Sequence, residues 1–327
     1  MTDNHDFIAL HGVTDIAALV PFLVGYQPQD ALVLIAIRDQ RILFTATAPL
    51  AKLTDATDGD WALRAVIDKT LDRVDLAGYG PAATVRTAAE YTVNALTRVD
   101  VNIGCVLRIH TDRLWSLHAD GTETPAAGIA FDPNTTAPAM QAHYLDMSVA
   151  PDRDTLVEAL TASLTAVTGT EQQAMARALA SADIHLAMLT QGPAPAARFR
   201  VNRVLTELLT EAKTAYRTGR LPDHRAALLI RLLAVPALHD KAMAHVYGDD
   251  LDIHLWTDLT RRAGTDLAAG PATALALAAL QHGDALLAKV AGEHARRSDP
   301  GNDFLDVIDD LIRYCVDPQV LHRKLHG

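Results

Sequence analysis

The sequence predicts an α/β domain at residues 1–118, followed by an all-helical domain. Short apolar runs bounded by turn residues recur in the first of these regions, and such runs are typical of buried strands. Beyond residue 154, apolar residues recur at intervals of three and four, which is the helical period. Only 5% of the residues are aromatic, and alanine is abundant. A core of small and aliphatic side chains suits closely packed helices better than a sandwich of strands.

The chain is expected to open with a helix and a buried strand. Thr14 can cap a helix over residues 15–20, and Pro21 suits the first position of a second short turn that Gly25 ends. The apolar run at 31–37 is too short for a helix with one apolar face, so it predicts a buried strand.

The elements that follow in the first domain alternate between strand and helix. Two pairs of strands are each joined by a short polar turn, which predicts two hairpins. The expected strands are 33–37, 42–48, 74–79, 102–109 and 114–117, and the expected helices are 61–71 and 81–96. The order β-β-α-β-α-β-β predicts a single sheet with helices packed on it.

Residues 119–150 are expected to form a loop or linker without regular structure. Prolines and glycines recur there among small polar residues. The helical domain is then expected at 151–327, and Asp154 can cap its first helix. Within 198–217, one face is apolar, whereas Arg203, Glu207, Thr210 and Lys213 are expected to face water.

One segment of the helical domain has a distinct signature. The run Gly283-Asp284-Ala285-Leu286-Leu287-Ala288 and the later Asp299-Pro300 resemble one tetratricopeptide unit. In that repeat the Gly-Asp pair ends the first helix, and small alanines let the second helix lie close to it. Ala276 departs from the pattern, which prefers glycine there. Since about three copies normally form a solenoid, a single unit is expected to pack within a larger helical domain. The residues expected to be buried are Leu275, Ala278, Leu286, Val290 and Ala291, with Ala288 and Ala295 at close helix contacts.

Charge and cysteine content restrict the class of protein. The net charge is −11, and residues 1–150 hold 18 acidic and 10 basic side chains. Because phosphate neutralisation supplies most nucleic-acid affinity, nucleic acid is not expected as a partner.

Cys105 and Cys315 are far apart in apolar settings, which favours reduced thiols. No Lys or Arg precedes Arg38, and no apolar run approaches the roughly 20 residues of a membrane helix, so a cytoplasmic location is expected.

Familiar catalytic and metal motifs are absent from the sequence. It contains no G-x-G-x-x-G after a strand, no Walker loop, no H-E-x-x-H, no C-x-x-C and no G-x-S-x-G. His239, His245 and His254 lie near several aspartates, but their spacing does not place two imidazoles on one helical turn. No metal is predicted, and no cofactor is indicated.

Residues 196–231 are locally basic. They could meet phosphate or an acidic partner. Arg203 and Glu207 are four residues apart and can pair, however, so a solvated charged face is the preferred interpretation.

Two glycine loops are the candidate ligand-binding loops. Residues 25–30 and 78–81 each join the sheet to a helix, and ligands of α/β layers tend to bind at such strand ends. Pro81 would open a helix whose amides face an anion, and Asp30 could act as a base or ligand. Turn formation alone also explains every glycine and proline in both loops.

The opening segment resembles that of an uncharacterised family of high-GC, actinobacterial-type bacteria, known as domain of unknown function 4192. Its members read roughly V-P-x-L-L-G-F-x-P-x-x-S-L-V, and the matching residues here are Val20, Pro21, Leu23, Gly25, Pro28, Leu32 and Val33. Tyr26 replaces Phe, and Ala31 stands where Ser is usual. The run Arg113-Leu114-Trp115-Ser116 also matches the family, as do Trp256 and the Gly283-Asp284 segment. Many relatives have cysteines after that strand; residues 117–121 have none, so the resemblance implies no metal or disulfide there. It brings no activity, cofactor or catalytic residue.

Two functions are therefore weighed. The preferred one is a non-catalytic binding or regulatory protein whose helical domain binds a protein partner. The alternative is an enzyme of unassigned type with its site around Asp30, Tyr79 and Arg113. The candidate binding residues are Gly25, Tyr26, Asp30, Gly78, Tyr79, Gly80, Arg113 and Trp115.

Overall fold

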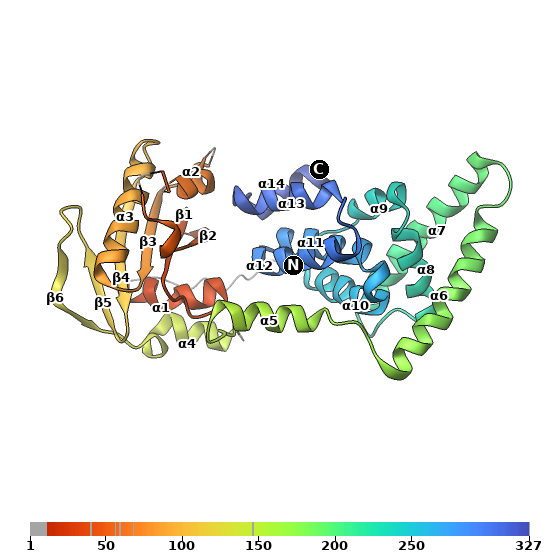
Figure 1. Cartoon of the computed structure of the whole chain (residues 1–327), viewed down its shortest axis with the longest axis horizontal. Helices are drawn as coiled ribbons and strands as arrows, with labels where there is room; N and C mark the ends of the chain where they lie inside the picture. Colours follow the sequence, from red (N-terminus) through yellow and green to blue (C-terminus); the bar gives the residue numbers. More distant parts are fainter. Residues whose placement is uncertain are drawn as a thin grey trace. The chain divides into compact units, whose positions relative to one another are not determined.

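The structure, a computed structural model, consists of two compact units (Figure 1). It describes residues 12–39, 41–55, 57–58, 60–67, 69–145 and 147–326. Contacts assign residues 1–156 and 313–315 to a first unit, and residues 157–312 and 316–327 to a second. The first unit contains a sheet with helices, and the second is helical. The predicted fold class, α/β followed by all-α, is confirmed.

Within the described residues, the sheet of the first unit has six strands in the order β2-β1-β3-β4-β5-β6. Their bounds are β1 Ala31–Arg38, β2 Arg41–Pro49, β3 Arg73–Tyr79, β4 Ile103–His110, β5 Arg113–Leu117 and β6 Glu123–Ala130. β3 and β4 are parallel, and all other neighbouring pairs are antiparallel. The parallel pair requires a crossover, which α3 provides (Ala82–Thr97).

Helices cover both faces of the sheet. α1 (Val13–Val24) packs on the face formed by Val33, Ile35 and Ala77, while α3 and α2 (Asp60–Val66) pack on the opposite face with Leu32 and Leu34. Successive side chains of β1 therefore enter different cores, which explains why the whole strand is apolar. A further helix, α4 (Ala137–Tyr144), packs against α1, and the short 3₁₀ turns are η1 (Leu50–Lys52) and η2 (Pro133–Thr135).

The expected break at Pro21 does not occur, because α1 continues through this proline to Val24. Thr14 lies inside the helix, and the N-cap position is Gly12. A proline has no N–H, so the carbonyl four residues earlier, that of Ala17, loses its helical donor. The Tyr79 hydroxyl, 3.4 Å away, donates to that carbonyl instead. A contact from a distant strand thus makes the proline tolerable.

Residues 119–150 contain regular structure, so the expectation of an irregular segment was wrong. β6 pairs with β5 at both of its ends, with a register shift between them. The Thr136 hydroxyl caps α4 by accepting a hydrogen bond from the Ala139 amide at 3.3 Å. Local composition predicted a loop here because glycine, alanine and proline give β6 a low strand propensity, although it forms a hairpin with the neighbouring strand β5.

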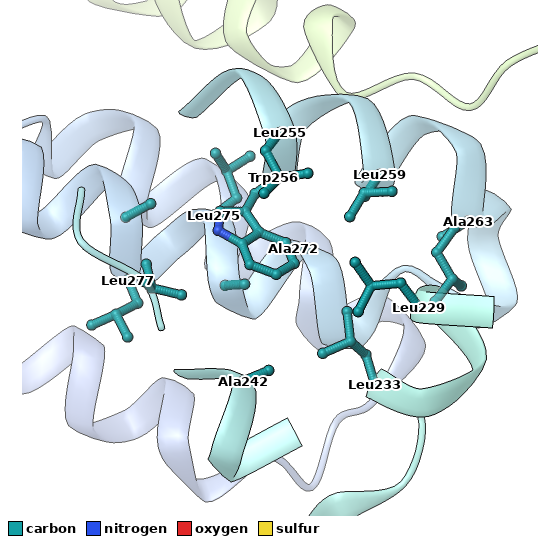
Figure 2. Close-up of a cluster of buried hydrophobic side chains, with 14 of the residues drawn as sticks. Leu229, Leu233, Ala242, Leu255, Trp256, Leu259, Ala263, Ala272, Leu275 and Leu277 are labelled. Atoms are coloured by element: carbon teal, nitrogen blue, oxygen red, sulfur yellow. The ribbon is translucent and has the colours of Figure 1, made fainter. Parts of the chain in front are cut away.

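The helical unit is organised around one large apolar core. Its helices, with α5 entering from the first unit, are α5 Arg153–Ser163, α6 Gly169–Leu189, α7 Ala194–Ala215, α8 Asp223–Leu233, α9 Pro236–Met243, α10 Asp250–Leu267, α11 Ala269–His282, α12 Ala285–Ser298, α13 Asp303–Arg313 and α14 Pro318–His326. Trp256 on α10 is fully buried and lies among leucine and alanine side chains, as Figure 2 shows. The family-like tryptophan is thus a core residue.

The segment that resembles a tetratricopeptide unit forms a packed hairpin of α11 and α12. Gly283 ends α11 with φ 94°, a left-handed conformation that favours glycine. The Asp284 carboxylate then caps α12 by accepting from the Leu287 amide at 2.8 Å. As expected, the buried side chains include those of Leu275, Ala278, Ala288, Val290, Ala291 and Ala295. The expectation for Leu286 was wrong: it is half-buried, and its neighbour Leu287 enters the core.

Candidate functional site

The two glycine loops lie at the same edge of the sheet. Ala31, which begins β1, pairs with Tyr79, which ends β3. Tyr79 also pairs with Ile109 near the end of β4. The loops 25–30 and 80–81 and the β4–β5 turn are therefore neighbours at this edge.

Asp30 and Gly80 are in close contact there. A Cβ added at Gly80, where φ is 148°, would lie 3.2 Å from Asp30 Oδ1 and 2.9 Å from Leu50 Cδ1. Asp30 has a left-handed backbone, φ 43°, and its carbonyl accepts a hydrogen bond from the Leu50 amide at 2.8 Å. Its side chain is exposed. Glycine at position 80 is thus required by packing.

The other residues of the two predicted loops also have structural roles, and Gly78 and Tyr79 belong to β3 rather than to a loop. A Cβ at Gly78 would lie 2.3 Å from Val85 Cγ1, so glycine lets α3 approach β3 closely. Gly25 ends α1 with φ 80°, and its carbonyl accepts from the Ala150 amide at 2.9 Å. Tyr26 is buried and forms a bridge with the same segment.

Tyr79 is enclosed in the core under α1. Its side chain is 4% exposed, and its hydroxyl donates to Ala17. Burial raises the pKa of Tyr79 far above its ordinary value. The phenol therefore stays protonated at neutral pH and is enclosed by apolar side chains.

Arg113 and Trp115 hold the irregular middle of β6. The Arg113 guanidinium donates to the Ala127 carbonyl at 2.6 Å and to the Gly128 carbonyl at 3.2 Å. A Cβ at Gly128, where φ is 69°, would lie 2.6 Å from Trp115 Cε2, so the strand crosses directly over the indole.

Beneath that indole is a buried ion pair. The Arg108 guanidinium lies 3.5 Å from the Trp115 ring centroid and donates to both Glu123 carboxylate oxygens, at 2.8 and 2.9 Å. Sequence reasoning missed Arg108 and Glu123. The two-residue spacing of Arg113 and Trp115 does place them on one face of a strand, which is the signal that could have led to this cluster.

The three side chains of the enzyme hypothesis do not converge. Tyr79 lies on the α1 face of the sheet. Paired residues on neighbouring strands share one face of the sheet. Trp115 pairs with Arg108, and Arg108 pairs with Gly78, which lies beneath α3. Trp115 and Arg113 therefore lie on the α3 face, opposite to Tyr79. Asp30 is exposed at the edge. The arrangement brings Asp30 to Gly80 and leaves Tyr79 and Arg113 apart.

Most of the basic side chains at 196–231 pair with acidic groups. Arg203 and Glu207 form the expected i,i+4 pair at 3.4 Å. The other pairs include Arg220 with Glu171, Arg225 with Glu211, and Arg231 with Asp183. Lys213 was wrongly assigned to the water face: its ammonium lies 3.1 Å from the fully buried carboxylate of Asp252.

In the described part of the chain, clusters of titratable side chains give little support for metal binding or for a reactive thiol. No group of three or more His, Cys, Asp or Glu residues there could hold a metal ion. Both cysteines are free, and burial, followed by the charge of Asp75, raises the pKa of Cys105 to about 12. Across the same described residues, no helix has the length and apolar content that crossing a membrane requires.

An exposed apolar surface is present on the helical unit instead. α6 and α7 form a hairpin at one side of that unit (Figure 1). Ile184, Met188 and Phe199, near the turn that joins the two helices, are 65%, 55% and 67% exposed. Arg200 holds this turn by donating to the carbonyls of Leu189, at 3.1 Å, and Gln191. We call residues 177–203 the α6–α7 arm.

Sequence reasoning did not identify this surface. Apolar residues lie on several sides of α6, and the face that packs in the core includes Met175 and Ala182. Which apolar face stays uncovered depends on the neighbouring helices.

The family model described as "Domain of unknown function (DUF4192)" matches residues 14–319. The chain belongs to this family. The match begins within α1 and ends within α14, so the DUF4192 domain includes both the sheet unit and the helical unit. No curated protein and no solved structure matches the chain.

Proposed function

We propose that this DUF4192 protein is a non-catalytic binding or regulatory protein that binds a protein partner through its helical unit. One observation carries the proposal: Ile184, Met188 and Phe199 are each more than half exposed on the α6–α7 arm. Large apolar side chains left exposed on one arm favour association with a partner, because covering them removes apolar area from water.

The enzyme hypothesis has less support from the geometry. Tyr79 and Arg113 are engaged in structural hydrogen bonds on opposite faces of the sheet. The pKa values of Asp55 and Asp120 are lowered because these exposed carboxylates accept hydrogen bonds within turns, and that of Asp152 is lowered because it accepts from the Thr155 amide at the start of α5. These features stabilise loops and supply no paired acid and base.

The proposal also includes a role for the α11–α12 hairpin, a cellular location and a class of partner. The α11–α12 hairpin acts as a tetratricopeptide-like unit within the helical unit, and the protein works in the cytoplasm of a high-GC bacterium. Its acidic balance, −11 overall, favours protein partners over nucleic acid.

The test is photocrosslinking from the arm. A photoreactive phenylalanine analogue at position 199 is expected to yield a discrete crosslinked protein in cells that contain the partner. The same analogue at Thr210, which is exposed on the same helix, is the matched control. Ile184→Ser is expected to abolish the crosslink. No crosslink at 199, or equal crosslinking at both positions, would contradict the proposal.

A further inference from the structure

The α6–α7 arm is basic, although the protein as a whole is acidic. It contains four arginines and one aspartate, whereas the whole chain has a net charge of −11. Arg177 lies seven residues before Ile184, on the same side of α6. Arg203 lies one turn beyond Phe199 on α7; its side chain is 63% exposed, and Glu207, 3.4 Å away, offsets part of its charge. Exposed arginines therefore flank the apolar side chains of the arm.

An acidic and apolar helix face occurs elsewhere on the same unit. Asp303, Asp306, Val307 and Asp310 of α13 are all exposed, and their spacing of three, four and seven residues places them on one side of the helix. Val307 is 51% exposed. Arg296 contacts Asp306 at 2.7 Å and so offsets part of this charge. Arg296 also contacts Asp309 at 2.9 Å, and Arg313 ends the helix, so α13 holds four carboxylates against these two guanidinium groups and remains acidic.

The arm and α13 lie on different sides of the helical unit, as Figure 1 shows. They cannot meet within one copy, but each copy presents both. Pairing of two arms with each other would bring like charges together, which disfavours association. Pairing of an arm with α13 brings opposite charges together around apolar side chains.

We propose that α13 of a second copy docks on the α6–α7 arm. This inference rests on the proposed binding role of the arm and names its occupant. The contact is heterologous, with different surfaces on the two copies, so it adds copies head to tail. Because exposed charges contribute, association weakens as salt rises.

Sedimentation velocity and light scattering on the full chain test this. At low salt, the measured mass of wild-type protein is expected to rise above that of a dimer as its concentration rises. At high salt, the mass is expected to return to that of the monomer. Phe199→Ser and Val307→Ser each remove one of the two surfaces, so each variant alone is expected to stay monomeric. Their equimolar mixture is expected to form a 1:1 dimer, because one copy keeps its α13 face and the other keeps its arm.

Val235→Ser, in the turn between α8 and α9, is the matched control and is expected to behave as the wild type. Circular dichroism checks that each variant is folded. Monomeric wild-type protein at every concentration would overturn the inference, as would Val307→Ser protein that assembles like the wild type. A crosslink from position 199 to a different protein, together with monomeric wild-type protein, would overturn the self-docking inference and support the proposed function.

Discussion

Replacement of Ala288 by leucine tests the packing of the helical unit most directly. Ala288 lies on α12, is 0% exposed and belongs to the large apolar core. Leucine would add three carbon atoms where the small side chain lets α11 and α12 lie close together. Overpacking of a dense core costs about 1 to 3 kcal/mol. For a unit of this size, each kcal/mol lowers the melting temperature by about 2 to 4 °C.

The assay is urea and thermal unfolding of the full chain, followed by circular dichroism. Lys289→Ala, one residue further along α12 on the exposed face of that helix, is the control and is expected to change the free energy of unfolding little. Leu286→Ala is expected to cost less than Leu287→Ala, since only Leu287 is buried. Equal, mild effects of Ala288→Leu and Lys289→Ala would refute the packing argument.

Four further predictions concern the sheet unit, a buried histidine and the domain boundary. Gly78→Ala is expected to cost about 1 to 3 kcal/mol, because its Cβ would lie 2.3 Å from Val85 Cγ1; an unchanged urea midpoint would be inconsistent with this. In a Cys315→Ser background, native Cys105 is expected to react with a thiol reagent at pH 8 far more slowly than unfolded protein, since its pKa is raised to about 12; equal rates would show that the thiol is accessible. Burial lowers the pKa of His239 below its ordinary 6.5, so the unfolded chain binds this proton more readily and stability is lost as pH falls below about 6.5. His239→Leu should flatten that decline between pH 7.5 and 5.5, and parallel melting curves for wild type and variant would reject the assignment. Limited proteolysis is expected to cut first within 119–150, in the stretch after α4, and early cleavage elsewhere with 119–150 intact would place the boundary differently.

Elements with a strong local pattern could be predicted from the sequence. The apolar run at 31–37 is a strand, and the alternation of strand and helix up to residue 117 matches the sheet unit. The Gly283-Asp284 pair ends one helix and caps the next, because glycine tolerates the left-handed conformation and a carboxylate accepts from free amides.

Elements that depend on distant partners could not be predicted. Pro21 breaks no helix because Tyr79, on a strand far along the chain, donates to the carbonyl that the proline leaves without a partner. β6 follows its partner β5 directly in the chain; it could not be predicted because its own strand propensity is weak and the contacts from Arg113 and Trp115 that hold it appear only in the fold.

The candidate site also combines features that the sequence predicts with features that only the fold decides. The sequence predicted glycine turns at 25 and 78–80; Gly25 and Gly80 have the positive φ of such turns, whereas Gly78 lies within β3, and strand order placed both turns at one edge of the sheet. The direction of each side chain followed from the register: Tyr79 points under α1, and Arg113 lies on the other face.

The sequence by itself determined the two structural classes, the charge balance and the helix ends, because these depend on residues close together in the chain. Tertiary structure decided which apolar faces are covered. Ile184 and Phe199 are as apolar as the core residues of the same helices, yet they remain exposed because no neighbouring helix in the described structure covers their side. Burial depends on partners that are distant in sequence, so the surface that we propose for binding became visible only in the folded protein.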